Sequence, residues 1–137
     1  MKREKAETAV SKASERSKRA VAYLRVAATD GAGHAVAVQR AACKRIAEQH
    51  GLTLVRAYVD LGKPARLVAQ TELQRLLADL ESQQDVAFVV VTDLARLARN
   101  PNSLQVIYQL ARNAGAEIVA YGQADITGTD FPGVGTH

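Results

Sequence analysis

The chain has 137 residues, of which 47% are hydrophobic and 23% charged, so it is long enough for one folded domain with a buried core. Its longest apolar runs, such as residues 86–91, are far shorter than the ~20 residues of a membrane-spanning helix, and residues 1–19 lack the apolar segment of a secretory signal. A single cysteine, Cys43, excludes an internal disulfide and a cysteine-based metal cage. His34, His50 and His137 are scattered, and the glycines at 31–33 lack the third glycine of a dinucleotide-binding motif, so we expect no metal and no cofactor. We also expect a cytoplasmic protein without a membrane partner.

The formal charge of +4 lies entirely in residues 1–19, because the remaining residues carry equal numbers of acidic and basic side chains. A basic arm beside a neutral domain predicts weak, salt-dependent and sequence-independent contact with DNA, and a solvated leader is the alternative. The basic residues of this arm are Lys2, Arg3, Lys5, Lys12, Arg16, Lys18 and Arg19.

Strand-like and helix-like segments alternate from residue 19 onward. Residues 19–27 form an apolar run typical of a strand covered on both faces, and residues 35–50 have helical spacing that ends at Gly51. Residues 52–60 alternate between apolar and polar positions, which predicts a second strand. Residues 61–70 contain a glycine and a proline without a clear period, so we expect a loop there.

The alternation of the second strand predicts which side chains share a face. It places Leu52, Leu54, Arg56 and Tyr58 on one side of the sheet and the residues between them on the other. The second helix follows from a leucine stripe at i, i+3, i+4 and i+7 spacing. The leucines of this stripe are Leu73, Leu76, Leu77 and Leu80.

The second half of the chain repeats the same order of elements. Residues 86–93 predict a buried strand, residues 104–111 a helix closed at residues 113–115, and residues 117–122 a last strand. This order predicts an α/β fold with a doubly wound, mostly parallel sheet of four to five strands flanked by helices. The expected divisions are a flexible or helical arm at 1–19, the α/β domain at 20–126 and a disordered tail at 127–137.

Arginines follow two of the predicted strands. Arg25 lies at the end of the first strand, and Arg96 and Arg99 lie three residues apart on an expected helical turn after the third. The carboxyl ends of parallel strands meet at one edge of a sheet, and guanidinium groups suit phosphate oxygens, so a phosphate or phosphodiester site is predicted. In the alternative interpretation, each arginine pairs with a carboxylate and fixes a loop. The candidate carboxylates are Asp60, Asp93 and Asp125.

Five segments together resemble one protein family. They are "YLRVAAT", "AVAVQRAACKRIAEQHG", "YVDLG", "VVVTDLARLARN" and "LARNAGAEIVAY". Their order and spacing over residues 20–126 resemble the N-terminal, catalytic-type domain of the resolvase/invertase serine recombinases. The resemblance implies a resolvase-like fold and a DNA-associated protein, since members of that family cut DNA through a phosphoserine link as dimers and tetramers.

The resemblance assigns phosphate- or DNA-binding positions to four residues. Arg25 falls on the first active-site arginine of the family and Gln39 on its helix glutamine, while Arg96 and Arg99 fall on the paired arginines after the third strand.

The catalytic positions of the family are changed in this sequence. The nucleophilic serine is replaced by Ala27, or by Ala28 if the loop register shifts by one. A second-loop arginine is replaced by Gln70, and the aspartate before Arg96 is replaced by Ala95. A methyl group cannot attack phosphorus, so no catalytic set is intact by this comparison.

Two other hydroxyls are candidates to replace the serine. Thr29 is the nearest, but the strand alternation points its side chain away from the expected site. Ser103 is expected near the start of a helix capped by Asn102, which makes it a poor nucleophile.

Three functions therefore stay open from the sequence. The first is a serine-recombinase-like protein that cannot cleave DNA, is not an enzyme, and acts as a DNA-associated or partner-binding accessory, either as a homo-oligomer or with a partner recombinase. The second is an active recombinase domain with an unorthodox nucleophile, or a fragment of a longer recombinase. The third is a phosphate- or anion-binding α/β module unrelated to recombination.

Overall fold

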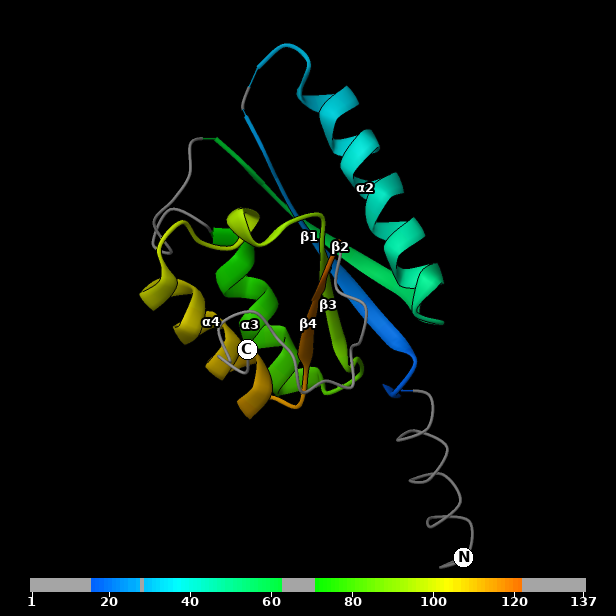
Figure 1. Cartoon of the computed structure of the whole chain (residues 1–137), viewed down its shortest axis with the longest axis vertical. Coiled ribbons are helices and arrows are strands. Elements are labelled where there is room, and N and C mark those ends of the chain that lie inside the picture. The colour runs from blue at the N-terminus through cyan, green and yellow to red at the C-terminus, as the bar shows by residue number, and fades with distance from the viewer. Residues whose placement is uncertain (1–15, 28, 63–70, 122–137) are drawn as a thin grey trace, which may run out of the picture.

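The computed structural model describes residues 16–27, 29–62 and 71–121 (Figure 1). Within these ranges, helices and strands alternate as the sequence predicts. In chain order the elements are β1 (Arg19–Val26), α2 (Ala32–Gln49), β2 (Thr53–Leu61), α3 (Thr71–Gln83), β3 (Phe88–Val91), the 3₁₀ turn η2 (Leu94–Arg96), α4 (Pro101–Asn113) and β4 (Glu117–Ala120).

The four strands form one parallel sheet in the order β2-β1-β3-β4. Helix α2 covers one face, and α3 and α4 cover the other, so the predicted doubly wound α/β fold is confirmed (Figure 1). The chain moves outward from β1 to β2 in one direction and from β3 to β4 in the other. The carboxyl ends of the adjacent strands β1 and β3 therefore flank the topological switch point, where ligands bind in such sheets.

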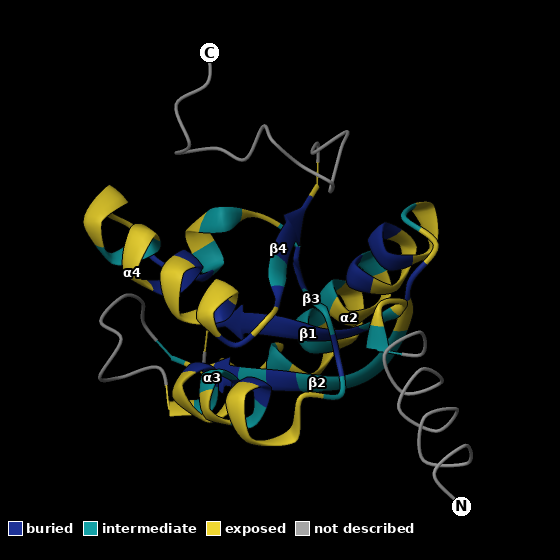
Figure 2. Ribbon diagram, turned by 90° about the horizontal axis from the view of Figure 1, so that it is seen from below, coloured by how far each residue is buried: buried dark blue, intermediate teal, exposed yellow. Residues whose placement is uncertain are grey.

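Strand β1 lies at the centre and is covered on both sides, as its continuous apolar sequence predicts. Ala22 and Leu24 pack on the α2 side with Cys43, whereas Val21 and Tyr23 pack on the side of α3 and α4. Figure 2 shows this buried central layer between helices whose outer faces are exposed. Each fully buried aliphatic side chain of this kind contributes roughly 1.5–3 kcal/mol.

Strand β2 contains a bulge that the sequence pattern does not reveal. Ala20 pairs with Leu54, but the next residue of β1 pairs with Arg56, which leaves Val55 as an extra residue. Leu54 therefore packs on the α2 side, while Val55 and Tyr58 pack on the α3 side. The prediction that Leu54 and Tyr58 share a face is wrong, because one inserted residue reverses the alternation on one side of the bulge.

The helix ends follow local signals, with one correction. Gly51 and Gly115 have φ of 71° and 85° just after α2 and α4, a left-handed conformation that glycine adopts without strain. Helix α4 is capped by Asn100, whose side chain accepts the Ser103 N–H at 2.8 Å, and not by Asn102 as predicted. Proline at the first helical position suits this earlier start.

Several predictions lie outside the described residues, namely those for most of the arm, the loop at 63–70 and the tail at 127–137. Over the part of the chain that is described, none of the helices is both long and apolar enough to cross a membrane.

Candidate functional site

The end of β1 and the turn after β3 hold each other through two arginines. Arg25 donates from Nε to the carbonyl of Arg96 at 3.1 Å and from Nη2 to the carbonyl of Ala95 at 2.7 Å. In return, Arg96 donates from Nη1 to the carbonyl of Arg25 at 3.0 Å. These reciprocal bonds join η2 to the central strand at the switch point and fix both guanidinium groups.

Helix α2 adds Gln39 to the same cluster. Its Nε2 donates to the Arg25 carbonyl at 3.0 Å, so this oxygen accepts from two side chains. The Oε1 atom of Gln39 is buried and has no hydrogen-bond partner among the described residues. The structure therefore places Gln39 beside Arg25, and its assignment as a phosphate- or DNA-binding residue stays a prediction.

Arg99 completes the arginine cluster, which we define as Arg25, Arg96 and Arg99. Burial lowers the pKa of Arg25, Tyr23 opposes this shift, and the positive charges of Arg96 and Arg99 lower the pKa further. The three groups are therefore close enough to interact. Arg99 is exposed, and within the described part of the chain no hydrogen bond or ion pair involves its side chain.

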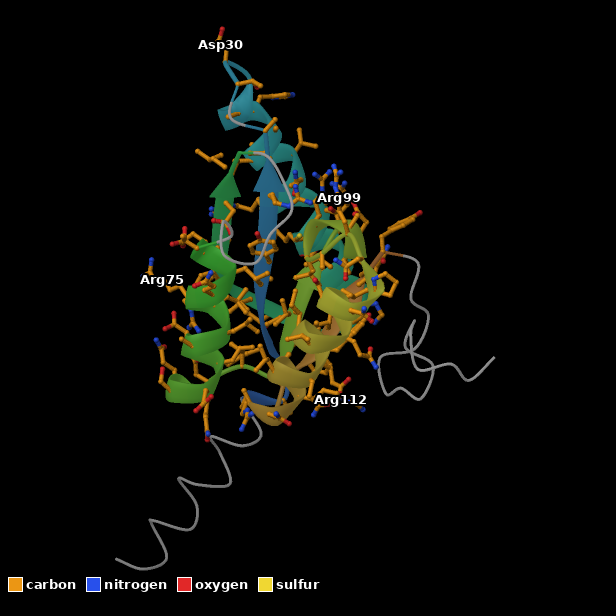
Figure 3. The ribbon with its side chains drawn as sticks, turned by 90° about the vertical axis from the view of Figure 1, so that its left-hand side faces the viewer. Asp30, Arg75, Arg99 and Arg112 are labelled. Carbon is orange, nitrogen blue, oxygen red and sulfur yellow. The ribbon has the colours of Figure 1, made fainter. Side chains whose placement is uncertain are left out.

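The expected helical turn for Arg96 and Arg99 is wrong in detail. Arg96 ends the three-residue turn η2, and Arg99 lies in a bend before α4 begins at Pro101. The bend still brings both residues into the field of Arg25. Figure 3 shows Arg99 toward the end of the molecule that carries Asp30, and Arg112 toward the opposite end.

Among the described residues, one arginine of the cluster pairs with a carboxylate as the alternative interpretation expects. Asp93 contacts Arg96, with 3.4 Å between Oδ2 and Nε, and both side chains are partly exposed. Asp60 is not paired with an arginine in the described structure, and Asp125 lies outside the described residues. Arg25 is bound by carbonyl oxygens, which orient a guanidinium without cancelling its charge.

Asp60 has a different role, which the sequence did not indicate. This buried carboxylate accepts the Tyr23 hydroxyl at 2.7 Å and the backbone N–H groups of Glu72 and Leu73 at 3.0 and 3.1 Å. It therefore caps the start of α3 from the end of β2, where a helix N-terminus favours a negative charge. The one available signal was Tyr23 in a buried strand, because a buried phenol needs a hydrogen-bond partner.

The positions that would carry catalysis have no hydroxyl where the structure describes them. Ala27 directly follows β1 and is exposed, and its carbonyl accepts the Thr29 N–H at 3.0 Å. Thr29 is exposed in the turn before α2. Ala95 is exposed, and its carbonyl binds Arg25. Residues 28 and 70 lie outside the described ranges, so the predictions for Ala28 and Gln70 stay predictions.

Two basic residues counted with the arm lie against the domain at the other end of the sheet. Arg16 donates to the carbonyls of Val86 and Ala114, and Arg19 donates to the carbonyl of Asp85. The Arg16 guanidinium thus meets the carboxyl end of α4, where positive charge is favourable. Among the residues that the structure describes, no group of three or more histidine, cysteine or acidic residues could hold a metal ion.

Comparison with known proteins identifies relatives of this fold. A family model described as "Resolvase, N terminal domain" matches residues 20–133. No curated protein matches the chain. The structure is similar to the C-terminal catalytic domain of ISC1926 TnpA, an IS607-like serine recombinase, with 23% identity and a TM-score of 0.65, covering 78% of this chain and 69% of that one.

Two further solved structures show the same likeness. The N-terminal catalytic domain of TP901-1 integrase has 23% identity and a TM-score of 0.64, covering 75% of this chain and 76% of that one. A resolvase family site-specific recombinase from Streptococcus pneumoniae has 25% identity and a TM-score of 0.61, covering 74% and 70%.

Proposed function

This chain belongs to the resolvase family, and on that premise we propose that it is a serine-recombinase-like, DNA-associated accessory that contacts phosphates but does not cleave DNA. The observation that carries the proposal is Ala27, which stands directly after the strand that presents Arg25 to the cluster. Such an accessory would act in the cytoplasm, with another copy of itself or with a partner recombinase.

The chemical argument is that strand cleavage through the protein needs an attacking oxygen. A covalent link to phosphorus forms only when an oxygen attacks in line with the leaving group, and the methyl group of Ala27 supplies none. Deleting a covalent nucleophile costs roughly a millionfold in rate in well-studied hydrolases. Charge stabilisation by the remaining arginines cannot offset a loss of that size.

The arginine cluster supports retained phosphate contact. Of the five N–H donors that a guanidinium carries, Arg25 uses two on backbone carbonyls, and Arg99 is exposed to solvent. A guanidinium is a planar cation with donors suited to phosphate oxygens. A phosphodiester at the switch point would reduce the mutual repulsion of the cluster, which gives binding without requiring chemistry.

A trap for covalent intermediates tests the proposal. The full chain is incubated with supercoiled and nicked DNA, denatured, and separated so that any protein–DNA adduct is retained. We expect no adduct and no new nicks. An adduct would show that the domain is an active recombinase, and its loss in Thr29→Ala would then identify the unorthodox nucleophile.

The same assay on Ala27→Ser distinguishes the loss of the nucleophile alone from the loss of several active-site groups. We expect this variant to form no adduct either, because Gln70 and Ala95 replace two further groups of the family's active site. Adduct formation by Ala27→Ser would contradict this expectation and show that one hydroxyl suffices. A circular dichroism spectrum matching the parent chain is the folding control.

A further inference from the structure

Strand β2 forms the longer edge of the sheet. It has nine residues against four in β4, the other edge, and within the described ranges it pairs with β1 on one side while no strand lies on its other side. The outward N–H and C=O groups of such an edge can pair with another extended chain. Proteins commonly prevent this pairing with charged side chains or prolines on the edge strand.

The charged residues of β2 do not protect its edge. Arg56 donates to Asp85 and to the Tyr58 hydroxyl, and Asp60 is buried where it caps α3. Five further side chains of the strand are partly or fully exposed and apolar, namely Leu54, Val55, Ala57, Val59 and Leu61. The charges of β2 are therefore engaged within the domain, and its outer edge is open to a further strand.

A hollow of about 500 Å³ lies between this edge and α2. The bulge accounts for the hollow, because Val55 packs on the α3 side and the Arg56 side chain reaches Tyr58 on that same side. Two successive residues of β2 thus leave the α2 side without a side chain. Ala47 and Ala57 line the hollow, and their small side chains leave room for those of a bound segment.

The wall of the hollow on α2 is mainly basic. Arg40 and Lys44 line it, both are exposed, and within the described part of the chain neither side chain takes part in a hydrogen bond or an ion pair. Glu48 lies one turn further along, near the end of α2 that leads into β2. The wall therefore carries two positive charges followed by one negative charge, which attracts carboxylates toward Arg40 and Lys44.

We propose that an extended acidic segment of another protein binds along β2 as an additional strand, with two carboxylates on Arg40 and Lys44. Side chains four residues apart on a helix have Cβ atoms about 5–6 Å apart. Alternate side chains of a strand share a face and lie roughly 6.5 Å apart. A segment with acidic residues at alternate positions therefore meets both cations with one face, while its backbone pairs with β2.

The edge of β2 suits a peptide better than a nucleic acid. A peptide strand offers N–H donors and C=O acceptors, which match the alternating groups of the edge, whereas phosphate groups only accept hydrogen bonds. The carbonyl oxygens of the edge and the carboxylate of Glu48 also repel phosphates. The hydrogen-bonding pattern and the charges together favour an acidic peptide.

Fluorescence anisotropy with a labelled synthetic peptide tests the site. The probe is an eight-residue peptide in which glutamate and valine alternate, and the full chain is titrated into it. We expect binding that Arg40→Gln/Lys44→Gln weakens by more than about tenfold and that Glu48→Gln tightens by about twofold. Arg45→Gln/Arg112→Gln is the matched control, because it removes two exposed arginines outside the hollow and should bind like the parent chain. No binding of the probe, or equal losses in the two double variants, would overturn the proposal.

Backbone methylation of the probe tests the added strand. Successive N–H groups of an extended chain point to opposite edges, so methylating the nitrogens of alternate residues removes the donors of one edge. Of the two peptides made in this way, one should lose binding and the other should keep it. Full binding by both peptides would show that no strand pairs with β2 and would refute the proposal.

A competition experiment distinguishes the peptide from a nucleic acid. A single-stranded oligonucleotide should not displace the probe from the parent chain. Displacement, together with oligonucleotide binding that Arg40→Gln/Lys44→Gln weakens as strongly as it weakens the probe, would assign the hollow to nucleic acid and contradict the proposal. Direct binding of the peptide is measured without DNA, so its failure is distinguishable from failure of the proposed function.

Discussion

The two ends of the sheet both gather arginines, but they treat the charge differently. At the amino end, Arg56 forms a bidentate pair with Asp85, with contacts of 2.7 and 3.1 Å, and Arg19 lies 3.8 Å from the same carboxylate. At the carboxyl end, Arg25 and Arg96 bind backbone carbonyls of each other's segments. The first set shares one carboxylate, Asp85, whereas in the second set carbonyls orient Arg25 and a carboxylate, Asp93, contacts Arg96 alone.

The difference is informative because a buried carboxylate is available at the carboxyl end. Asp60 pairs with Arg25 across the β1–β2 ladder, yet its side chain caps α3 instead of binding that guanidinium. Arg25 and Arg96 are therefore held in place by backbone carbonyls, and the three arginines of the cluster exceed the one carboxylate, Asp93, that contacts them. A purely structural cluster would gain more from the arrangement seen at the amino end.

The largest expected effect comes from removing the carboxylate that caps α3. Asp60→Ala should lower the free energy of unfolding by about 2–4 kcal/mol, because α3 loses its cap and the Tyr23 hydroxyl loses its hydrogen bond to this carboxylate. Chemical denaturation measures this change. Tyr23→Phe is the milder comparison at about 1 kcal/mol, and equal stability of Asp60→Ala and the parent chain would refute the capping role.

A smaller loss of stability, which depends on pH, should follow from breaking the Arg56–Asp85 pair at the amino end of the sheet. The hydrogen bond from Arg56 lowers the pKa of Asp85 against the opposing effect of burial, so the pair stabilises the fold above the ordinary aspartate value of about 3.9 and loses that contribution as pH falls through the folded pKa. Arg56→Met should cost about 1 kcal/mol near pH 7 and reduce the acid sensitivity.

Denaturation of Arg56→Met at several pH values provides that measurement. Arg75→Met is the control, because Arg75 is 67% exposed on α3 and its contact with Glu72 is 3.6 Å. Identical pH profiles for Arg56→Met and Arg75→Met would show that the Arg56–Asp85 pair does not stabilise the folded chain.

The sequence predicted the fold well where the signal is local. The apolar run of β1, the leucine stripe of α3 and the glycines after α2 and α4 each reflect short-range packing or backbone geometry, and these elements were located to within a few residues. The bulge at Val55 was missed because it depends on how β2 pairs with β1, which the alternation within one strand does not record.

The site could be predicted only in part for the same reason. Arg25 and Arg96 were expected to meet because parallel strands end at a common edge. Their carbonyl partners, and the capping of α3 by Asp60, depend on atoms that are distant in the chain and carry no side-chain signature. A backbone oxygen is present at every residue, so the sequence cannot indicate which one an arginine will choose.

The most direct test of phosphate binding by the arginine cluster is the salt dependence of DNA binding by Arg99→Ala and Arg112→Ala. Each variant removes one exposed arginine, but Arg112 pairs with Glu117 and lies toward the opposite end of the molecule (Figure 3). We predict that Arg99→Ala binds DNA more weakly, with a logarithmic salt slope shallower by about 1, and that Arg112→Ala binds like the parent chain. Equal slopes for Arg99→Ala and the parent chain would contradict phosphate binding by the arginine cluster.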